Sequence, residues 1–150
     1  MRETAREYLA RMERYLGDDD PFDVLRSTPR ALRRLVAGAP RRRLTSGLAP
    51  GKWSAIEILS HLADVDLVWG YRIRKILEEP GARIQPMEQD RWVEECRYAE
   101  ARADEALEAF AALRRAGEHG YFGRLTIRKI VRMLAGHDRN HAGQLRRILG

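Results

Sequence analysis

The sequence predicts an all-α protein whose 150 residues form a single four-helix-bundle domain, residues 1–150. Apolar side chains recur along the chain with the period of about 3.6 residues that is typical of amphipathic helices. No segment alternates apolar and polar residues between hairpin turns, as strands would. Because 44% of the residues are hydrophobic, the chain is able to bury a core of its own. We therefore expect four principal helices with short or moderate connections.

The first expected helix carries one apolar stripe and ends at Gly17, which three aspartates follow. The stripe consists of Tyr8, Leu9, Met12, Tyr15 and Leu16. Since these residues share one face of a helix, that face is expected to pack on the rest of the bundle.

Two dipeptides follow in which a helix-capping residue directly precedes a proline. Asp20-Pro21 and Thr28-Pro29 both show this pattern, which is typical of helix starts. They predict two short helices, over residues 21–27 and 29–37. The next segment, 41–52, holds two glycines and a proline and is expected to be a loop.

A long helix is predicted from Ser54 to Glu79. Ser54 and Glu57 have the spacing of a capping box, in which each side chain bonds the other residue's backbone N–H. The helix is expected to stop at Pro80-Gly81. Its inward stripe comprises Ile58, His61, Leu62, Val65, Val68, Trp69, Ile73, Ile76 and Leu77.

Trp53 stands just before this capping box. An apolar residue at that position often packs against a residue in the first helical turn, here Ile58. Two turns of helix place Trp53 about 12 Å along the axis from His61. We expect a structural role for the indole, with an aromatic wall for a substrate as the alternative.

Two further helices are expected in the second half of the chain. Asp90 is positioned to cap the third, which is expected to end at Gly117 and the Gly120–Gly123 turn. Its inward residues are Val93, Cys96, Ala99, Ala103, Leu107, Phe110 and Leu113. The last helix is expected to open at Thr126, with His137 and His141 on its apolar stripe.

Three histidines carry the candidate chemistry. His137 and His141 are one helical turn apart, so both imidazoles can point the same way and bind one ion. Both interrupt an apolar stripe, where an unpaired polar ring costs free energy. His61 has an equivalent inward place in the long helix. Together they could supply three neutral nitrogens to an open metal site.

Other interpretations of these residues remain open. Each inward histidine could be a hydrogen-bonded core residue without a metal. A zincin peptidase also has two histidines at this spacing, but a glutamate follows its first histidine. Here Asp138 follows His137, with a shorter side chain. His119, the fourth histidine, is expected at the surface.

Carboxylates near His61 have two possible roles. Glu57 lies one turn before His61 and Asp64 nearly one turn after it. Either could orient an imidazole N–H or act on a metal-bound water. The alternative is the capping box for Glu57, and a solvated helix face for Asp64 and Asp66. The sequence therefore assigns no catalytic residue.

Composition excludes several classes of function. The formal net charge is +6, yet 25 of the 28 cationic residues are arginines scattered among acidic ones, without a basic stripe. We expect no nucleic-acid partner. No apolar run is long enough to span a membrane, and the N-terminus lacks the apolar stretch of a signal peptide. With Cys96 as the single cysteine, the chain fits a reducing compartment, and we expect it in the cytoplasm.

Two stretches of the sequence resemble a known family. Residues 50–64, Pro-Gly-Lys-Trp-Ser-Ala-Ile-Glu-Ile-Leu-Ser-His-Leu-Ala-Asp, and residues 136–145, which contain His137-Asp138 and His141-Ala142-Gly143-Gln144, are similar to motifs of the DinB-like (DinB/YfiT) superfamily. Trp69 and Arg72 between these stretches also fit, as do Asp23-Val24-Leu25 and Thr28-Pro29 upstream. The resemblance thus covers most of the chain.

The resemblance implies an up-up-down-down four-helix bundle that is often dimeric. It also implies a divalent metal, zinc or nickel, held by His61, His137 and His141. Characterised relatives include thiol transferases and isomerases that use low-molecular-weight thiols. The chain departs from the family in residues 110–123, which are shorter than the family's usual pocket-lining stretch.

Two functions from different classes follow from this resemblance. The first is an enzyme in which the metal activates a thiol or a water toward a small-molecule substrate, as a thiol S-transferase or a hydrolase does. The second is a metal-dependent binding or stress-response module without turnover. In either case we expect a homodimer, because the short 110–123 region would leave apolar surface uncovered.

Overall fold

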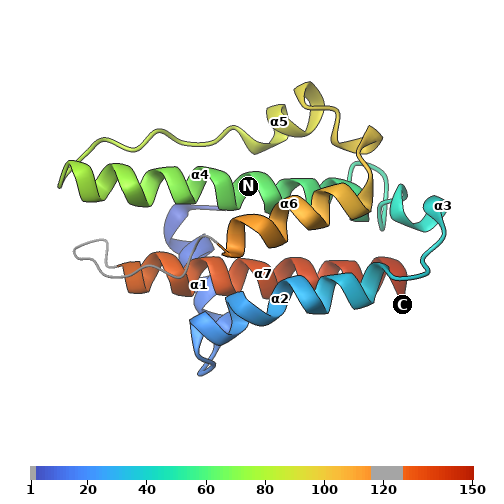
Figure 1. Cartoon of the computed structure of the whole chain (residues 1–150), viewed down its shortest axis with the longest axis horizontal. Coiled ribbons are helices and arrows are strands. Elements are labelled where there is room, and N and C mark those ends of the chain that lie inside the picture. The colour runs from blue at the N-terminus through green and yellow to red at the C-terminus, as the bar shows by residue number, and fades with distance from the viewer. Residues whose placement is uncertain (1–2, 116–126) are drawn as a thin grey trace.

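A computed structural model of the protein describes residues 3–115 and 127–150. Within these ranges every regular element is a helix, and one isolated bridge joins Gly47 to Ser54. The predicted all-α four-helix bundle is confirmed (Figure 1). Its helices are α2 (Pro21–Val36), α4 (Ala55–Glu78), α6 (Ala103–Arg115) and α7 (Ile127–Leu149).

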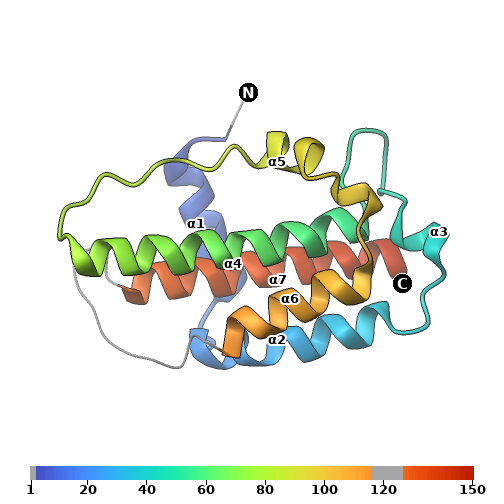
Figure 2. The same ribbon diagram turned by 45° about the horizontal axis from the view of Figure 1, so that its top comes forward.

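The four helices run in two directions. In Figure 1, α2 and α7 point one way and α4 and α6 the other, so the chain order is up-down-down-up. Residues 79–102 connect the end of α4 to the start of α6, and this connection runs back along the length of the bundle (Figure 2). The up-up-down-down order that the resemblance implied would need a second crossover of this kind, whereas α2 and α4 are joined at the same end of the bundle.

A further helix, α1 (Ala5–Leu16), crosses the bundle and packs on α7 (Figure 2). It ends as predicted at Gly17, whose φ of 60° lies in the left-handed region that glycine adopts without strain. Met12 and Leu16 are fully buried. Tyr8 is partly buried against the same cluster as Met12, whereas Leu9 and Tyr15 are 49% and 42% exposed, so only part of the predicted stripe packs on the bundle.

Gly136 makes the crossing of α1 and α7 possible. A Cβ placed on Gly136 would lie 2.1 Å from the carbonyl oxygen of Met12, far inside van der Waals contact. The two backbones therefore touch at this point. The residue that follows is His137, so the crossing lies directly beside the candidate site.

One continuous helix replaces the two short helices predicted over 21–27 and 29–37. Asp20 caps α2 as expected, because its side chain accepts from the N–H groups of Phe22 and Asp23. Pro29, however, lies inside the helix. The Thr28 hydroxyl donates to the Val24 carbonyl at 2.8 Å. Since that side of α2 packs on α7, burial offsets the cost of the proline.

The start of α4 agrees with the sequence. Ser54 is the N-cap and forms the predicted reciprocal capping box with Glu57. The preceding segment was expected to be a loop over 41–52, but it contains one short helix, α3 (Arg41–Leu44). Pro40 at its N-cap allows this turn to form.

The third helix is not continuous. It divides into α5 (Gln89–Glu95), a short 3₁₀ turn η1 (Tyr98–Glu100) and α6. Asp90 lies inside α5 rather than at its cap, which is Glu88. Cys96 is exposed instead of facing inward. The predicted inward residues Leu107 and Phe110 of α6 are buried.

A long-range contact explains the break. Arg97 has a φ of 52°, which turns the chain out of the helical path. This turn buries Tyr98 against α4, where its hydroxyl donates to Asp64. Helical periodicity carries no information about a partner 34 residues away, so the sequence pattern did not predict the break.

The main core lies where α4, α6 and α7 meet. Its buried members include Leu59, Leu62, Leu107, Phe110 and Leu145. Thr126, the predicted start of the last helix, and most of the shortened 110–123 region lie outside the described residues. Among the described helices, none has a stretch long and apolar enough to cross a membrane.

Candidate metal centre

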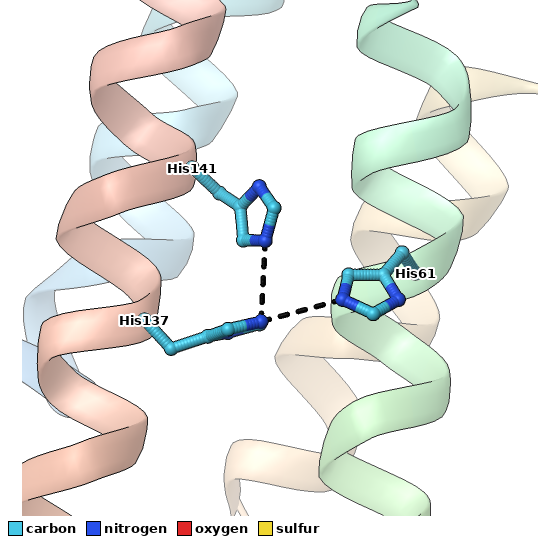
Figure 3. Close-up of side chains that lie close together, drawn as sticks. All are labelled: His61, His137 and His141. Carbon is cyan, nitrogen blue, oxygen red and sulfur yellow. Dashed lines mark hydrogen bonds between the residues drawn. The ribbon is translucent and has the colours of Figure 1, made fainter. Parts of the chain in front are cut away.

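Three imidazoles from two helices meet inside the bundle, as predicted. α4 contributes His61, and α7 contributes His137 and His141 from successive turns (Figure 3). His137 Nε2 lies 3.1 Å from His141 Nε2 and 3.3 Å from His61 Nε2. One ligand nitrogen of each residue lies within 4.8 Å of the other two. The rings therefore direct their nitrogens at one small volume.

All three rings are removed from solvent. The exposed fractions are 2% for His61, 7% for His137 and 6% for His141. Burying a polar group is unfavourable unless a partner compensates for the lost hydration. The ring nitrogens that face one another are placed where one bound ion could contact all three.

Gln144 fixes the protonation of one ring. Its side-chain oxygen lies 2.6 Å from Nδ1 of His141, one helical turn earlier on α7. Because an amide oxygen only accepts, Nδ1 of His141 carries the proton. Its Nε2 then presents a lone pair to the centre, as a metal-ligating histidine does.

Hydrogen bonds among the rings do not satisfy all three nitrogens. A neutral imidazole nitrogen has either one proton or one lone pair, so His137 Nε2 cannot donate to one neighbour and accept from the other. A tetrahedral zinc ion with Zn–N bonds of about 2.0–2.1 Å holds neighbouring nitrogens about 3.3 Å apart. Two of the three nitrogen pairs, at 3.1 and 3.3 Å, match that spacing, and the third pair lies within 4.8 Å. The donor set fits a divalent ion.

The environment keeps the rings of His61 and His141 neutral. Burial, reinforced by the neighbouring His141, lowers the pKa of His61 from 6.5 to about 3. Burial also lowers the pKa of His141 from 6.5 to about 4, with a smaller contribution from the positive charge of Arg11. A metal binds the neutral form of histidine, so both residues are in the ligating state at neutral pH.

The nearby carboxylates have other partners. Glu57 accepts from the backbone N–H and the hydroxyl of Ser54, at 2.7 Å each, which favours the capping role. Asp64 accepts from Tyr98, so it is part of a side-chain pair rather than a solvated face. Burial and this hydrogen bond raise the pKa of Tyr98. In the described part of the chain, Nδ1 of His61 has no hydrogen-bond partner.

Trp53 lies beside the centre. Its ring centroid is 4.8 Å from that of His61, although about 12 Å along the helix axis was expected. The expectation failed because Trp53 precedes the helix, and its side chain reaches along the first turns of α4. The indole also packs against the core cluster that includes Ile58. It is both a structural residue and a wall of the centre.

Comparison with known proteins places the chain in a family. The sequence pattern of the DinB superfamily matches residues 25–145, which include all three histidines. The chain belongs to the DinB superfamily. Among solved structures, this DinB-superfamily fold is similar to YfiT from Bacillus subtilis, with a TM-score of 0.73 and 16% identity over 98% of this chain and 88% of that one. YfiT is described as "a probable metal-dependent hydrolase with an unusual four-helix bundle topology". A comparison with curated proteins finds no match.

The three histidines of this DinB-superfamily chain can be identified from its sequence, but the contacts that Gln144 and Trp53 make with them cannot. Gln144 had a detectable signal, because it follows His141 by three residues and shares its helix face. The ring contact of Trp53 had none, since it depends on how the chain turns before α4. His119, expected at the surface, lies outside the described residues.

Proposed function

We propose that the protein holds one divalent ion per chain through His61, His137 and His141, and uses it to act on a small molecule. The convergence of three buried ring nitrogens is the observation that carries this proposal. Zinc and nickel are the metals we favour, because three imidazoles suit both.

A divalent ion in this place supplies Lewis-acid chemistry, which lowers the pKa of a water or thiol ligand and makes its anion available near neutral pH. The chain contributes the rest. Gln144 holds the His141 ring in the ligating tautomer, and burial keeps the imidazoles of His61 and His141 uncharged. Three protein ligands leave a further coordination position for substrate, as in catalytic zinc sites.

Hydrolysis of a small molecule is the reaction class we favour, and the description of YfiT supports it. Thiol S-transfer with a low-molecular-weight thiol is the second candidate, which rests on the family resemblance. The third is a metal-dependent binding or stress-response module without turnover. Glu57 and Asp64 are engaged elsewhere in this structure, which is the observation that keeps the non-catalytic candidate in view.

A turnover assay tests the proposal. Protein purified without a histidine tag is loaded with zinc or nickel and offered a panel of small esters, amides and lactones, and separately a thiol with electrophilic acceptors. We expect turnover in the first panel that disappears in His137→Ala. Thiol consumption alone would support the transferase, and stoichiometric metal without turnover in either panel would support the binding module.

We also propose that the protein is a cytoplasmic homodimer. The exposed single thiol of Cys96 is compatible with a reducing compartment, and Leu67 and Tyr71 are large apolar side chains exposed on α4. Light scattering at micromolar concentration is expected to give twice the mass of the 17.3 kDa chain. A uniform species with the mass of one chain would contradict the dimer.

A further inference from the structure

Arg11 of α1 lies on the side of that helix that faces the histidines. α1 crosses α7 at the contact between Met12 and Gly136. On one side of α1, Glu13 pairs with Arg132, which precedes Gly136 on α7. Residues two apart on a helix point about 200° away from each other, so Arg11 is on the opposite side from Glu13. That side faces the part of α7 that follows Gly136.

The part of α7 that follows Gly136 carries His137, His141 and Gln144. The electrostatics agree with this placement, because the positive charge of Arg11 contributes to the lowered pKa of His141. The Arg11 side chain is 30% exposed, whereas the histidines are buried. Its guanidinium therefore lies nearer to solvent than the imidazoles do, on the side of α1 that the helical spacing turns toward them, and we call this position the rim of the centre.

The guanidinium already binds a carboxylate. Its Nε donates to Oε1 of Glu3 at 2.9 Å, and its Nη2 donates to Oε2 at 2.7 Å. This two-point geometry is how arginine recognises carboxylates. The rings of Tyr8 and Tyr15, with centroids 5.3 and 6.0 Å from the guanidinium carbon, support it from the side.

The partner of Arg11 is easily exchanged. Glu3 is exposed and precedes the first residue of α1, so little packing holds its side chain. The two side chains are 30% and 38% exposed, so solvent screens part of their attraction. A carboxylate that is also held at a second point would displace Glu3 without a large cost.

The charge of Arg11 also bears on a bound metal ion. Glu3 neutralises the guanidinium, and without Glu3 the guanidinium would repel a divalent ion in the centre. An anionic group between them reverses the sign of both interactions. The centre and Arg11 together therefore favour a ligand that brings negative charge to the rim.

We propose that Arg11 binds the carboxylate of the substrate, and that Glu3 occupies its guanidinium when substrate is absent. This inference rests on the proposed metal centre and names its substrate class, a small carboxylic acid. Arg11 is thus a specificity-determining residue and Glu3 a resident competitor.

Two matched thiols test the proposal on cobalt-loaded protein. 3-Mercaptopropionate and 3-mercapto-1-propanol have the same chain length and thiol, and only the first has a carboxylate. Binding is followed through the visible absorption of cobalt. For each protein we take the ratio of the affinity for the acid to the affinity for the alcohol. We expect this ratio to be about tenfold larger in the wild type than in Arg11→Gln, because the two charge-assisted hydrogen bonds of the guanidinium contribute roughly that factor.

Three further variants sharpen the test. Glu3→Gln should bind the acid several-fold more tightly, because it frees the guanidinium while leaving Arg11 in place. Arg11→Lys keeps the charge but loses the two-point hydrogen bonding. Its preference for the acid over the alcohol should lie between those of the wild type and Arg11→Gln. Arg6→Gln removes the same charge from an exposed position of α1 and should leave the preference unchanged.

The outcomes are distinguishable. Equal preference ratios in wild type and Arg11→Gln, with normal cobalt spectra in both, would overturn the role of Arg11 and leave the metal centre standing. Unchanged affinity in Glu3→Gln would overturn the role of Glu3. A wild type that takes up no cobalt would overturn the metal centre and this inference with it.

Discussion

At the scale of single residues, the centre depends on contacts that set the state of each imidazole. His141 receives its tautomer from Gln144, and the ring of His61 lies against the ring of Trp53. Neither neighbour is itself a ligand in the proposed centre. Both are therefore expected to change metal affinity without changing stoichiometry.

Replacing Gln144 by leucine should weaken metal binding. The N–H at Nδ1 of His141 loses its acceptor, so the ring is no longer held with Nε2 toward the centre, a loss that typically costs 10–100-fold in affinity. Competition with a chelating dye measures the change. Gln144→Glu keeps an acceptor and should retain affinity; equal affinity in the leucine variant would contradict this role.

Replacing Trp53 by alanine should affect both stability and the centre. The indole is partly buried against the core, so we expect a loss of about 3 kcal/mol in the free energy of unfolding, the lower end for large aromatic deletions. Metal affinity should also fall, because His61 loses the ring beside it. Urea unfolding and metal titration separate the two effects, and Trp53→Phe should preserve most of both. Unchanged stability would reject the structural role.

The residues of the site were predictable to different degrees. His137 and His141 could be predicted because helical spacing and an apolar stripe are local properties of the sequence. His61 was predicted from its place on a second stripe, and the structure brings it to the other two. The rim position of Arg11 depends on the angle at which α1 crosses α7, and no local pattern contains that angle.

At the scale of helices, the crossing of α1 over α7 depends on one glycine. Gly136→Ala places a methyl group 2.1 Å from the Met12 carbonyl oxygen, and backbone atoms yield less than side chains. We expect a loss of at least about 2 kcal/mol in the free energy of unfolding, as for other overpacked contacts. Chemical denaturation measures it.

Gly143→Ala is the matched control on the same helix. Its new methyl group would lie 3.7 Å from the nearest other atom, the flexible end of Arg147, so no clash occurs. Alanine favours helix over glycine by up to about 1 kcal/mol, and this variant should be as stable as wild type or more so. If both variants behave alike, α1 does not pack as described.

Local signals predicted some helix boundaries and not others. The capping box of Ser54 and Glu57 was predictable because both partners lie within four residues. Pro29 misled the prediction, because burial of α2 against α7 outweighs the local preference of proline for a helix start. The break after Cys96 needed the distant pair of Tyr98 and Asp64, which periodicity does not record.

At the scale of the whole molecule, the buried histidines make the metal-free protein sensitive to acid. In the unfolded chain these residues have a pKa of 6.5, whereas the folded values are about 3 for His61 and about 4 for His141. As the pH falls below 6.5, the unfolded chain takes up protons that the folded chain does not. The free energy of unfolding therefore decreases, by up to about 1.4 kcal/mol per pH unit for each group.

Urea unfolding of metal-free protein between pH 7.5 and 4.5 measures this dependence. We expect stability to be level above pH 7 and to fall steadily from pH 6.5 to 4.5. A variant with glutamine at positions 61, 137 and 141 lacks these titrating groups. Its free energy of unfolding should decrease less steeply as the pH falls. Parallel curves for the two proteins would show that these histidines do not set the acid limit.

Metal stoichiometry tests the central claim most directly. Elemental analysis of protein purified without a histidine tag, with and without added zinc or nickel, counts ions per chain. We predict about one ion per chain in wild type and in His119→Ala, and none at stoichiometric level when His137 and His141 are both alanine. If the double variant keeps its ion, or the wild type takes up none, the three-histidine centre is wrong.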